Sequence, residues 1–400
     1  MRRQGYRFRL KPSVVEEASL RQFLGCSRFV WNAILAENTY RYDQGDPLPL
    51  TYAALCARLQ ILKTRHEFLR AVHSQPLQQT LRDLAGAYEM AFDPNLAAQM
   101  PTFKKKAYAQ GIRFPQGFNV ERSGVFLPKI GWVSFRVSKR TARRKIEGEV
   151  KNVTVRLEAS NWYVSFQTER AVDERTHKNA GSVIGVDVGV ARFAALSDGT
   201  FFDGVNAFKQ HERRLARLQR RLARKVKFSA NWRKAKARIA KLHSRIANIR
   251  KDQVHKASAT ISKNHALVVL ENFNVANMTA AARGTVANPG SNVAAKSGLN
   301  RRILDQGWGE FRRQLGYKLA WTGGTLLLVD PRNTSRTCSA CGHVSAENRL
   351  TQAAFTCVAC GRASNADTNA AINILRRAGQ ARIACGDAQA STKQEAPRAA

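Results

Sequence analysis

The sequence predicts a multidomain chain in which an α/β domain is combined with a β-barrel and a helical segment. Three observations support this fold class. The 400 residues are too many for one compact domain. Apolar runs of strand length alternate with segments of helical periodicity. The hydrophobic fraction of 44% is large enough to build several cores, which excludes a disordered polybasic chain.

The predicted α/β domain begins with a three-stranded meander in residues 182–205. An apolar run at 183–190 contains Asp187, a second run follows at 193–196, and the hairpin dipeptide Asp198-Gly199 leads into a third. Further strands are expected at 266–271 and 325–329, with a helix at 308–319 between them. This order of strands and helices predicts an α/β sheet of mixed direction.

Antiparallel strands are expected in residues 1–15 and 101–180. One hairpin is predicted at 124–136 around Pro128-Lys129, and another at 153–166 around Ser160-Asn161. Together with the first strand they could close a small barrel. Residues 16–100 have helical spacing, with breaks at 45–47 and 74–76 that predict three or four helices. Residues 284–300 are expected to form a linker, and residues 379–400 a disordered tail.

The net charge of +37, from 66 Lys and Arg against 29 Asp and Glu, predicts a polyanionic partner, with nucleic acid as the first candidate. A membrane surface is the competing partner, but no apolar run reaches the roughly 18 residues of a spanning helix. The apparent absence of an export signal and the scattered thiols Cys26, Cys56 and Cys385 favour the cytoplasm.

A basic helical hairpin is expected at 205–262. Residues 209–256 contain 18 Lys and Arg against the two acids Glu212 and Asp252. Such a hairpin could lie along a nucleic-acid backbone, although a basic coiled coil without a groove is the alternative. The candidate contacts in this hairpin and in the basic strip near Phe103 are Lys104, Lys105, Arg213, Arg217, Arg220, Arg221 and Arg224.

Three acids follow or begin apolar elements. Asp187 lies in the first strand of the meander, Glu271 ends the run 266–271, and Asp367 begins a helix-like run at 367–375. Read singly, they could be a turn residue, a strand end and a helix cap. Read together, they form the oxygen ligand set for a pair of magnesium ions in phosphodiester cleavage.

Two Cys-x-x-Cys pairs, separated by 15 residues, predict one structural zinc ion bound by Cys338, Cys341, Cys357 and Cys360. A closed four-sulfur site leaves no open position for catalysis. Redox pairs or an iron-sulfur cluster are the alternatives. His343 could replace one ligand, but a solvated knuckle residue is the preferred interpretation.

The order of these motifs resembles the TnpB proteins of bacterial insertion sequences, which are also called OrfB. The resemblance covers residues 5–378 and rests on four motifs in order: Gly-Val-Asp-Val-Gly at 185–189, Leu-Glu-Asn at 270–272, the four-cysteine ribbon, and Asp-x-Asn-Ala-Ala-x-Asn-Ile at 367–374. Supporting stretches are Trp308-Gly309-Glu310-Phe311 and Thr337-Cys338-Ser339-Ala340-Cys341-Gly342.

The resemblance implies an RNA-guided DNA endonuclease related to type V CRISPR effectors. It implies an RNase H-like RuvC nuclease domain at 181–333 and 361–378, with an inserted zinc ribbon at 334–360. It also implies a wedge-like β-barrel at 1–15 and 101–180 and a helical recognition lobe at 16–100. The triad Asp187, Glu271 and Asp367 would hold two magnesium ions. The guide RNA would come from the right end of the element.

The resemblance also implies that the wedge and helical lobes read a short motif beside the double-stranded target DNA, with Tyr52 and Gln78 as candidate contacts. One departure concerns the last motif, where the family often has Asp-Arg-Asp and this chain has Asn365-Ala366-Asp367. An RNA-guided repressor without cleavage and an accessory protein of transposition are the alternative functions. The three acids favour the nuclease, and no separate strand-transfer motif supports a DNA-joining transposase.

Overall fold

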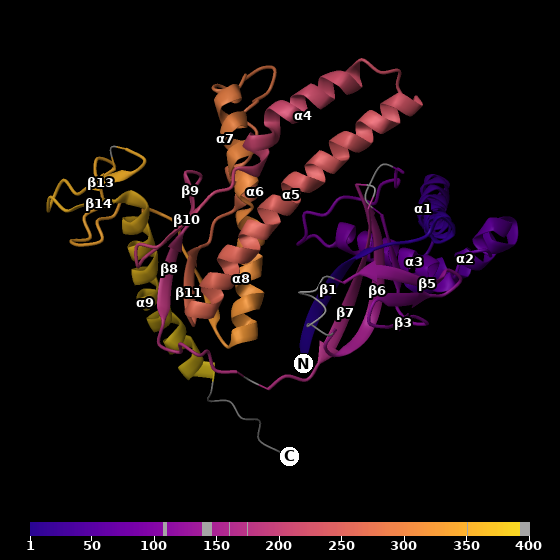
Figure 1. Cartoon of the computed structure of the whole chain (residues 1–400), viewed down its shortest axis with the longest axis horizontal. Helices are drawn as coiled ribbons and strands as arrows, with labels where there is room; N and C mark the ends of the chain where they lie inside the picture. Colours follow the sequence, from indigo (N-terminus) through magenta and orange to yellow (C-terminus); the bar gives the residue numbers. More distant parts are fainter. Residues whose placement is uncertain (107–109, 138–145, 160, 174, 350, 393–400) are drawn as a thin grey trace. The chain divides into compact units, whose positions relative to one another are not determined.

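The computed structural model describes residues 1–106, 110–137, 146–159, 161–173, 175–349 and 351–392 (Figure 1). The chain divides into two compact units, Met1–Asp173 and Glu174–Ala400. Every predicted site residue of the acid triad and of the zinc ribbon belongs to the second unit.

The first unit contains a seven-stranded antiparallel sheet in the order β2-β6-β7-β1-β5-β4-β3. The predicted hairpins are confirmed, and Lys129 takes a left-handed backbone at the expected turn (φ 62°). Ser160, in the other expected turn, lies outside the described residues. The bounds are β1 (Arg2–Leu10), β2 (Gln110–Phe114), β3 (Asn119–Val120), β4 (Gly124–Leu127), β5 (Gly131–Arg136), β6 (Glu149–Glu158) and β7 (Asn161–Arg170).

This sheet is curled, and the predicted closed barrel is not found among the described strands. β1 pairs with β7 from Arg2 to Arg9 but with β5 only at Arg9 and Leu10, so the sheet turns at the end of β1. The two edge strands, β2 and β3, do not pair with each other within the described residues. The barrel prediction was therefore correct in strand content, and the described strands form a curled sheet.

The helices α1 (Val14–Asp43), α2 (Tyr52–Arg65) and α3 (Ser74–Phe92) pack on this sheet, with a short 3₁₀ turn at Glu67–Leu69. Ser13 caps α1 in a capping box with Glu16. Pro76 lies in the first turn of α3, where its missing N–H costs nothing, so the predicted break is a helix start. Phe23 of α1 and Phe114 of β2 are 5.9 Å apart between ring centroids, and helices and sheet share one hydrophobic core.

The second unit is built on a five-stranded sheet in the order β10-β9-β8-β11-β12. The predicted mixed direction is confirmed, because β8, β9 and β10 form an antiparallel meander and β8, β11 and β12 are parallel. The bounds are β8 (Val183–Asp187), β9 (Arg192–Leu196), β10 (Phe201–Asp203), β11 (Leu267–Glu271) and β12 (Thr325–Val329).

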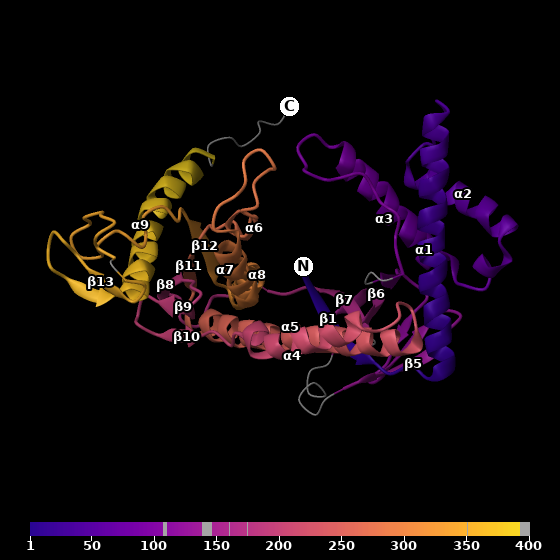
Figure 2. The same ribbon diagram turned by 90° about the horizontal axis from the view of Figure 1, so that it is seen from above.

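Helices cover both faces of this sheet (Figure 1). Helices α5 (Ala230–Asn264) and α8 (Trp308–Thr322) bury one face, and α9 (Ala366–Thr392) packs on the other. The predicted basic hairpin is confirmed: α4 (Ala207–Ala223) runs beside α5 in both views (Figure 2). None of the described helices is long and apolar enough to cross a membrane.

Two predictions about irregular segments were wrong in part. The expected linker 284–300 contains the start of helix α7 (Val293–Gln306), because Ile303 buries its side chain in the core of the second unit. The short helix α6 (Val275–Met278) precedes it. The expected disordered tail is helical as far as Thr392, the last residue of α9, and residues 393–400 lie outside the described residues.

Candidate active site and metal centre

The three predicted acids lie at the same end and on the same face of the second sheet. Along β11, Val268 and Leu270 face the core under α5 and α8, whereas Leu267 and Val269 face α9. Because side chains alternate along a strand, Glu271 points to the α9 side, and by the same alternation so does Asp187, since Ile184 and Val186 face the other core.

Gly185 allows α9 to approach this strand. A Cβ built on Gly185 would lie 2.1 Å from the carbonyl oxygen of Ala371 and 2.9 Å from the Cβ of Leu375. Only a residue without a side chain permits this contact between backbones. The close packing brings the first turn of α9, which contains Asp367, to the carboxyl ends of β8 and β11.

The three carboxylates influence one another electrostatically. Burial, reinforced by the negative charges of Glu271 and Asp367, raises the pKa of Asp187 to about 8. Burial also raises the pKa of Glu271, although a hydrogen bond from Thr334 and the charge of Arg377 oppose this effect. Two buried acids whose pKa values are raised, Asp187 and Glu271, fit a site completed by divalent cations.

Within the described residues, the three acids do not form a ligand group as compact as that of the four cysteines. Among the described residues, one group of three or more His, Cys, Asp or Glu has all its ligand atoms within 4.8 Å of one another. This group consists of the four cysteines. The acids do not meet this criterion.

Two residues that sequence analysis missed contact the acids. The hydroxyl of Thr334 donates to Oε1 of Glu271 at 2.5 Å, and Nη2 of Arg349 donates to Oδ1 of Asp367 at 3.3 Å. The charge of Arg349 also partly opposes the rise in the pKa of Asp187. Thr334 and Arg349 are 63 residues from Glu271 and 18 residues from Asp367, respectively, and no local sequence pattern marks either contact.

The departure at Asn365-Ala366 has a local structural role. The Oδ1 atom of Asn365 accepts hydrogen bonds from the backbone N–H groups of Asp367 and Thr368, at 3.1 and 3.2 Å. Asn365 therefore caps the N-terminus of α9. Ala366 is fully buried against Cys338, Phe355 and Cys357, where an arginine side chain would not fit.

The four predicted zinc ligands come together. The Sγ atoms of Cys338 and Cys360 are 3.7 Å apart, and those of Cys341 and Cys357 are 3.6 Å apart. All four lie within 4.8 Å of one another, as a tetrahedral zinc site requires. Gly342 and Gly361 have φ angles of 80° and 70°, which explains a glycine after each pair.

The surroundings of the Cys338 sulfur also suit a metal. Although burial raises the pKa of the Cys338 thiol, hydrogen bonds from the backbone N–H groups of Cys341 and Ala340 lower it to about 6. Such hydrogen bonds stabilise thiolates. His343 is exposed and lies outside the ligand set, in agreement with the preferred interpretation of the sequence.

Two asparagines of α9 join the zinc ribbon to the acid site. Asn369 accepts a hydrogen bond from the N–H of Ser339 at 2.9 Å and donates to the carbonyl of Thr337 at 2.8 Å. Asn373 donates to the carbonyls of Thr334 and Thr337, at 2.9 and 2.7 Å. The small hairpin of β13 (Ala354–Thr356) and β14 (Ala363–Asn365) completes the ribbon. The Asn-Ala-Ala-x-Asn motif therefore fixes the segment that carries Thr334.

The predicted nucleic-acid contacts fall into two groups. In the first unit, Tyr52 begins α2 with the guanidinium of Arg82 4.4 Å from its ring centroid, and Gln78 lies on α3. Lys104 is half-buried, with its ammonium 3.3 Å from the centroid of the Trp31 ring, and burial lowers its pKa to about 8. Lys105 is exposed. In the second unit, the predicted arginines are exposed along α4 and its C-terminal cap: Arg213, Arg217, Arg220, Arg221 and Arg224.

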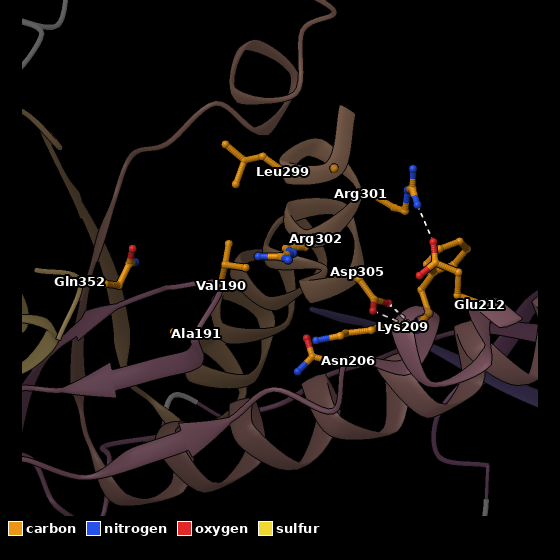
Figure 3. Close-up of a pocket in the computed structure, with 12 residues that line it drawn as sticks. Val190, Ala191, Asn206, Lys209, Glu212, Leu299, Arg301, Arg302, Asp305 and Gln352 are labelled. Atoms are coloured by element: carbon orange, nitrogen blue, oxygen red, sulfur yellow. Dashed lines mark hydrogen bonds and ion pairs between the residues drawn. The ribbon is translucent and has the colours of Figure 1, made fainter. Parts of the chain in front are cut away.

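A cavity of about 610 Å³ lies beside the turn that follows β8 (Figure 3). Val190, which lines this cavity, is three residues after Asp187 in the sequence. Val190 and Ala191 of the β8–β9 turn form one wall, and residues of α4 and α7 form the other. Asp305 of α7 accepts two hydrogen bonds from the N–H of Phe208, at 2.9 and 3.1 Å, and so fixes the first turn of α4. Sequence analysis identified neither the cavity nor Asp305.

With this geometry established, similarity to known proteins identifies the family. Residues 164–282 match the OrfB_IS605 family, which is described as a probable transposase, and residues 308–374 match the Cas12f1-like TNB domain. The chain is 48% identical to an Escherichia coli K12 protein named "Putative RNA-guided DNA endonuclease InsQ", over 96% of this chain and 94% of that protein. The chain belongs to the TnpB (OrfB) family.

Other matches extend this picture. A Streptomyces pristinaespiralis protein named "Putative RNA-guided DNA endonuclease" is 32% identical over 99% of this chain and 97% of its own length. In fold, this TnpB-family chain resembles the Cas12f1 protein of a complex with sgRNA and target DNA. The TM-score is 0.52 at 18% identity, over 90% of this chain and 82% of the other.

One match differs from the observed local structure. Residues 1–46 match a family described as a helix-turn-helix domain. In this protein they contain strand β1 and the single 30-residue helix α1. The N-terminal segment therefore belongs to the sheet and helices of the first unit and does not form a helix-turn-helix.

Proposed function

We propose that this chain is an RNA-guided DNA endonuclease whose second unit is an RNase H-like RuvC nuclease domain. The observation that carries the proposal is the grouping of Asp187, Glu271 and Asp367 on the α9 side of one sheet end. A meander followed by two parallel strands, with acids at the ends of the first and fourth strands, is consistent with that fold. The names of the two relatives support the same activity.

The residues fit a pair of magnesium ions. Hard cations prefer carboxylate oxygens, and divalent cations would offset the burial and the neighbouring negative charges that raise the pKa of Asp187. Bound there, the ions would supply electrostatic stabilisation to the phosphodiester and an activated water molecule. Thr334 orients the Glu271 carboxylate by donating to Oε1, and Arg349 holds Asp367.

The zinc ribbon has a structural role in this proposal. Zinc at the four cysteines would fix the ribbon, and the ribbon fixes Arg349 and the segment that begins at Thr334. Asn348, which is fully buried, contributes by accepting from the N–H of Val358 and donating to the carbonyls of Arg336 and His343. In this proposal, zinc influences the acids indirectly: the ribbon that it fixes holds Thr334 against Glu271 and Arg349 against Asp367.

The partners in this proposal are a guide RNA from the right end of the element and double-stranded target DNA. The exposed arginines of α4 would contact nucleic-acid phosphates. Tyr52 and Gln78 would contribute to reading a short motif beside the target, while base pairing with the guide supplies sequence specificity. The reaction would take place in the bacterial cytoplasm, where the four cysteines stay reduced.

The test begins with expression of the protein together with the DNA that follows its gene. We expect a single discrete RNA that ends at the element boundary to copurify. The complex should then cut double-stranded DNA that matches the guide in the presence of Mg²⁺. Asp187→Asn should bind the same DNA without cutting it. Cutting by this variant at the wild-type rate would refute the assignment of the acids.

The RNA-guided repressor is the second candidate, because the guanidinium of Arg349 forms an ion pair with Asp367. If this ion pair excludes the metal, the wild-type complex will bind matched DNA and leave it intact. Arg349→Gln would then be expected to create cleavage. In the nuclease proposal, the same substitution lowers cleavage or leaves it unchanged.

A further inference from the structure

The end of the α4–α5 hairpin carries cations and aromatic rings whose particular ligand the proposed function does not specify. We define the hairpin tip as residues 224–238, together with Arg221. A cavity of about 470 Å³ lies between the two helices at this tip. Five cationic side chains line it, namely Arg221, Arg224, Lys225, Lys234 and Arg238, and all five are exposed.

The positive charge of this cavity has no acidic partner among the described residues of the second unit. No acidic residue lines the cavity, and within the described part of the chain no ion pair joins any of its five cations. Two other cations of the hairpin are paired within the described residues, Lys256 with Asp252 at 2.6 Å and Arg250 with Asp305 at 4.0 Å. Five unpaired cations around one groove favour a ligand with several negative charges, such as a phosphate backbone.

Aromatic rings lie beside these cations. Phe228 is 64% exposed, and its ring centroid is 5.4 Å from that of Trp232, which is half-buried behind it. The ammonium of Lys236 lies 4.9 Å from the Trp232 ring centroid and that of Lys227 lies 5.5 Å from the Phe228 ring centroid. Rings flanked by cations are typical of surfaces that stack nucleobases between phosphate contacts.

The backbone at Phe228 strengthens this interpretation. Its φ angle is 68°, in the left-handed region that disfavours residues with a β-carbon. Glycine would form the same turn at lower cost. Ser229 then caps α5 by accepting from the N–H of Trp232 at 3.1 Å, which holds the second ring beside the turn. The turn itself does not require an exposed aromatic ring, so a ligand is the better explanation of Phe228.

We propose that the hairpin tip binds an unpaired segment of the guide RNA, with one nucleobase stacked on Phe228 and the neighbouring phosphates in the cationic groove. This inference rests on the proposed function for the identity of the RNA. A duplex keeps its bases inside and offers no face to an exposed ring, whereas unpaired RNA bases are splayed outward and stack on aromatic side chains. The mixture of ring and cations therefore fits single-stranded RNA.

Substitution of Phe228 separates stacking from folding. Because glycine accepts a left-handed backbone, Phe228→Gly should leave the unfolding temperature of the protein unchanged or higher. It should weaken binding of the copurified RNA by about tenfold, as expected for one lost base–aromatic stack. Phe228→Tyr keeps a ring at this position and should restore wild-type affinity. Equal affinity of wild type and Phe228→Gly would overturn the proposal.

A second experiment tests the hairpin tip even if the guided-nuclease proposal fails. The probe is a 12-nucleotide oligouridylate, and its affinity is measured against salt concentration in buffer without divalent cations. Arg221→Gln should reduce the slope of log affinity against log salt by about 0.7, as expected for one phosphate contact of a single strand. Lys256→Gln, whose cation is already paired on the same helix, should not change the slope. Equal slopes for wild type and Arg221→Gln would refute the groove assignment.

Ultraviolet crosslinking of the purified complex distinguishes the possible partners. The proposal predicts that peptides containing Phe228 or Trp232 crosslink to RNA before any DNA is added. Crosslinks from these peptides to target DNA alone would overturn it. Absence of copurified RNA would refute the guided nuclease, while the oligouridylate measurement would still decide the role of the tip.

Discussion

Replacing Asp187 by asparagine should stabilise the metal-free protein. The aspartate has a pKa of about 8 in the folded chain, against an ordinary value of 3.8, because burial and two neighbouring acids disfavour its charge. The folded state therefore holds a proton that the unfolded chain releases. The contribution of this acid to the free energy of unfolding is therefore largest below pH 3.8 and is lost as pH rises from 3.8 toward 8.

The magnitude follows from these two values. At pH 7, which is about three pH units above the ordinary pKa of 3.8, ionisation of the aspartate stabilises the unfolded chain by ~1.36 kcal/mol for each unit. The cost to folding is therefore about 4 kcal/mol if the site does not relax. Asparagine is neutral in both states and removes this cost, so Asp187→Asn should gain up to about 4 kcal/mol at pH 7. At pH 4 the gain should nearly disappear.

The assay is urea unfolding in EDTA at pH 7 and at pH 4, followed by tryptophan fluorescence. Asp203→Asn, an exposed acid of β10 in the same sheet, is the matched control and should change stability by less than ~0.5 kcal/mol. Saturating Mg²⁺ should stabilise the wild type and have little effect on Asp187→Asn. The reasoning fails if this variant is equal to or less stable than the wild type in EDTA at pH 7.

Three further predictions concern the packing around the acids. Gly185→Ala should destabilise the second unit by about 3 kcal/mol in urea unfolding, because its Cβ would meet the Ala371 carbonyl, whereas Gly181→Ala, in open space, should have little effect. Thr334→Val should lower the DNA cleavage rate without weakening RNA binding, since it removes the donor to Glu271. Thr337→Val, whose hydroxyl donates only to the Asn333 carbonyl, serves as its control, and equal cleavage by both variants would contradict a role for Thr334. Zinc removal by a chelator that spares Mg²⁺ should lower cleavage as strongly as Thr334→Val does. A zinc-free protein with full cleavage would show that the ribbon does not position the acids.

Much of the fold could be predicted because its signals are local. Alternating apolar residues and the Asp198-Gly199 turn predicted the meander, and unbroken helical spacing predicted the basic hairpin. The linker at 284–300 was misjudged because Gly298 and the residues near Pro289 are local turn signals. Helix α7 forms there through tertiary burial of Ile303, which a local pattern does not reveal.

The sequence by itself determined which residues are candidates for the proposed chemistry. It placed the acids Asp187, Glu271 and Asp367 at element ends and gave four cysteines a spacing that predicts one zinc ion, since both signals depend only on residue type and separation. The tertiary structure alone decided how these parts are joined. Arg349 and Thr334 reach the acids because the asparagines of α9 hold the ribbon against the sheet, and such contacts between distant segments leave no periodic trace in the sequence.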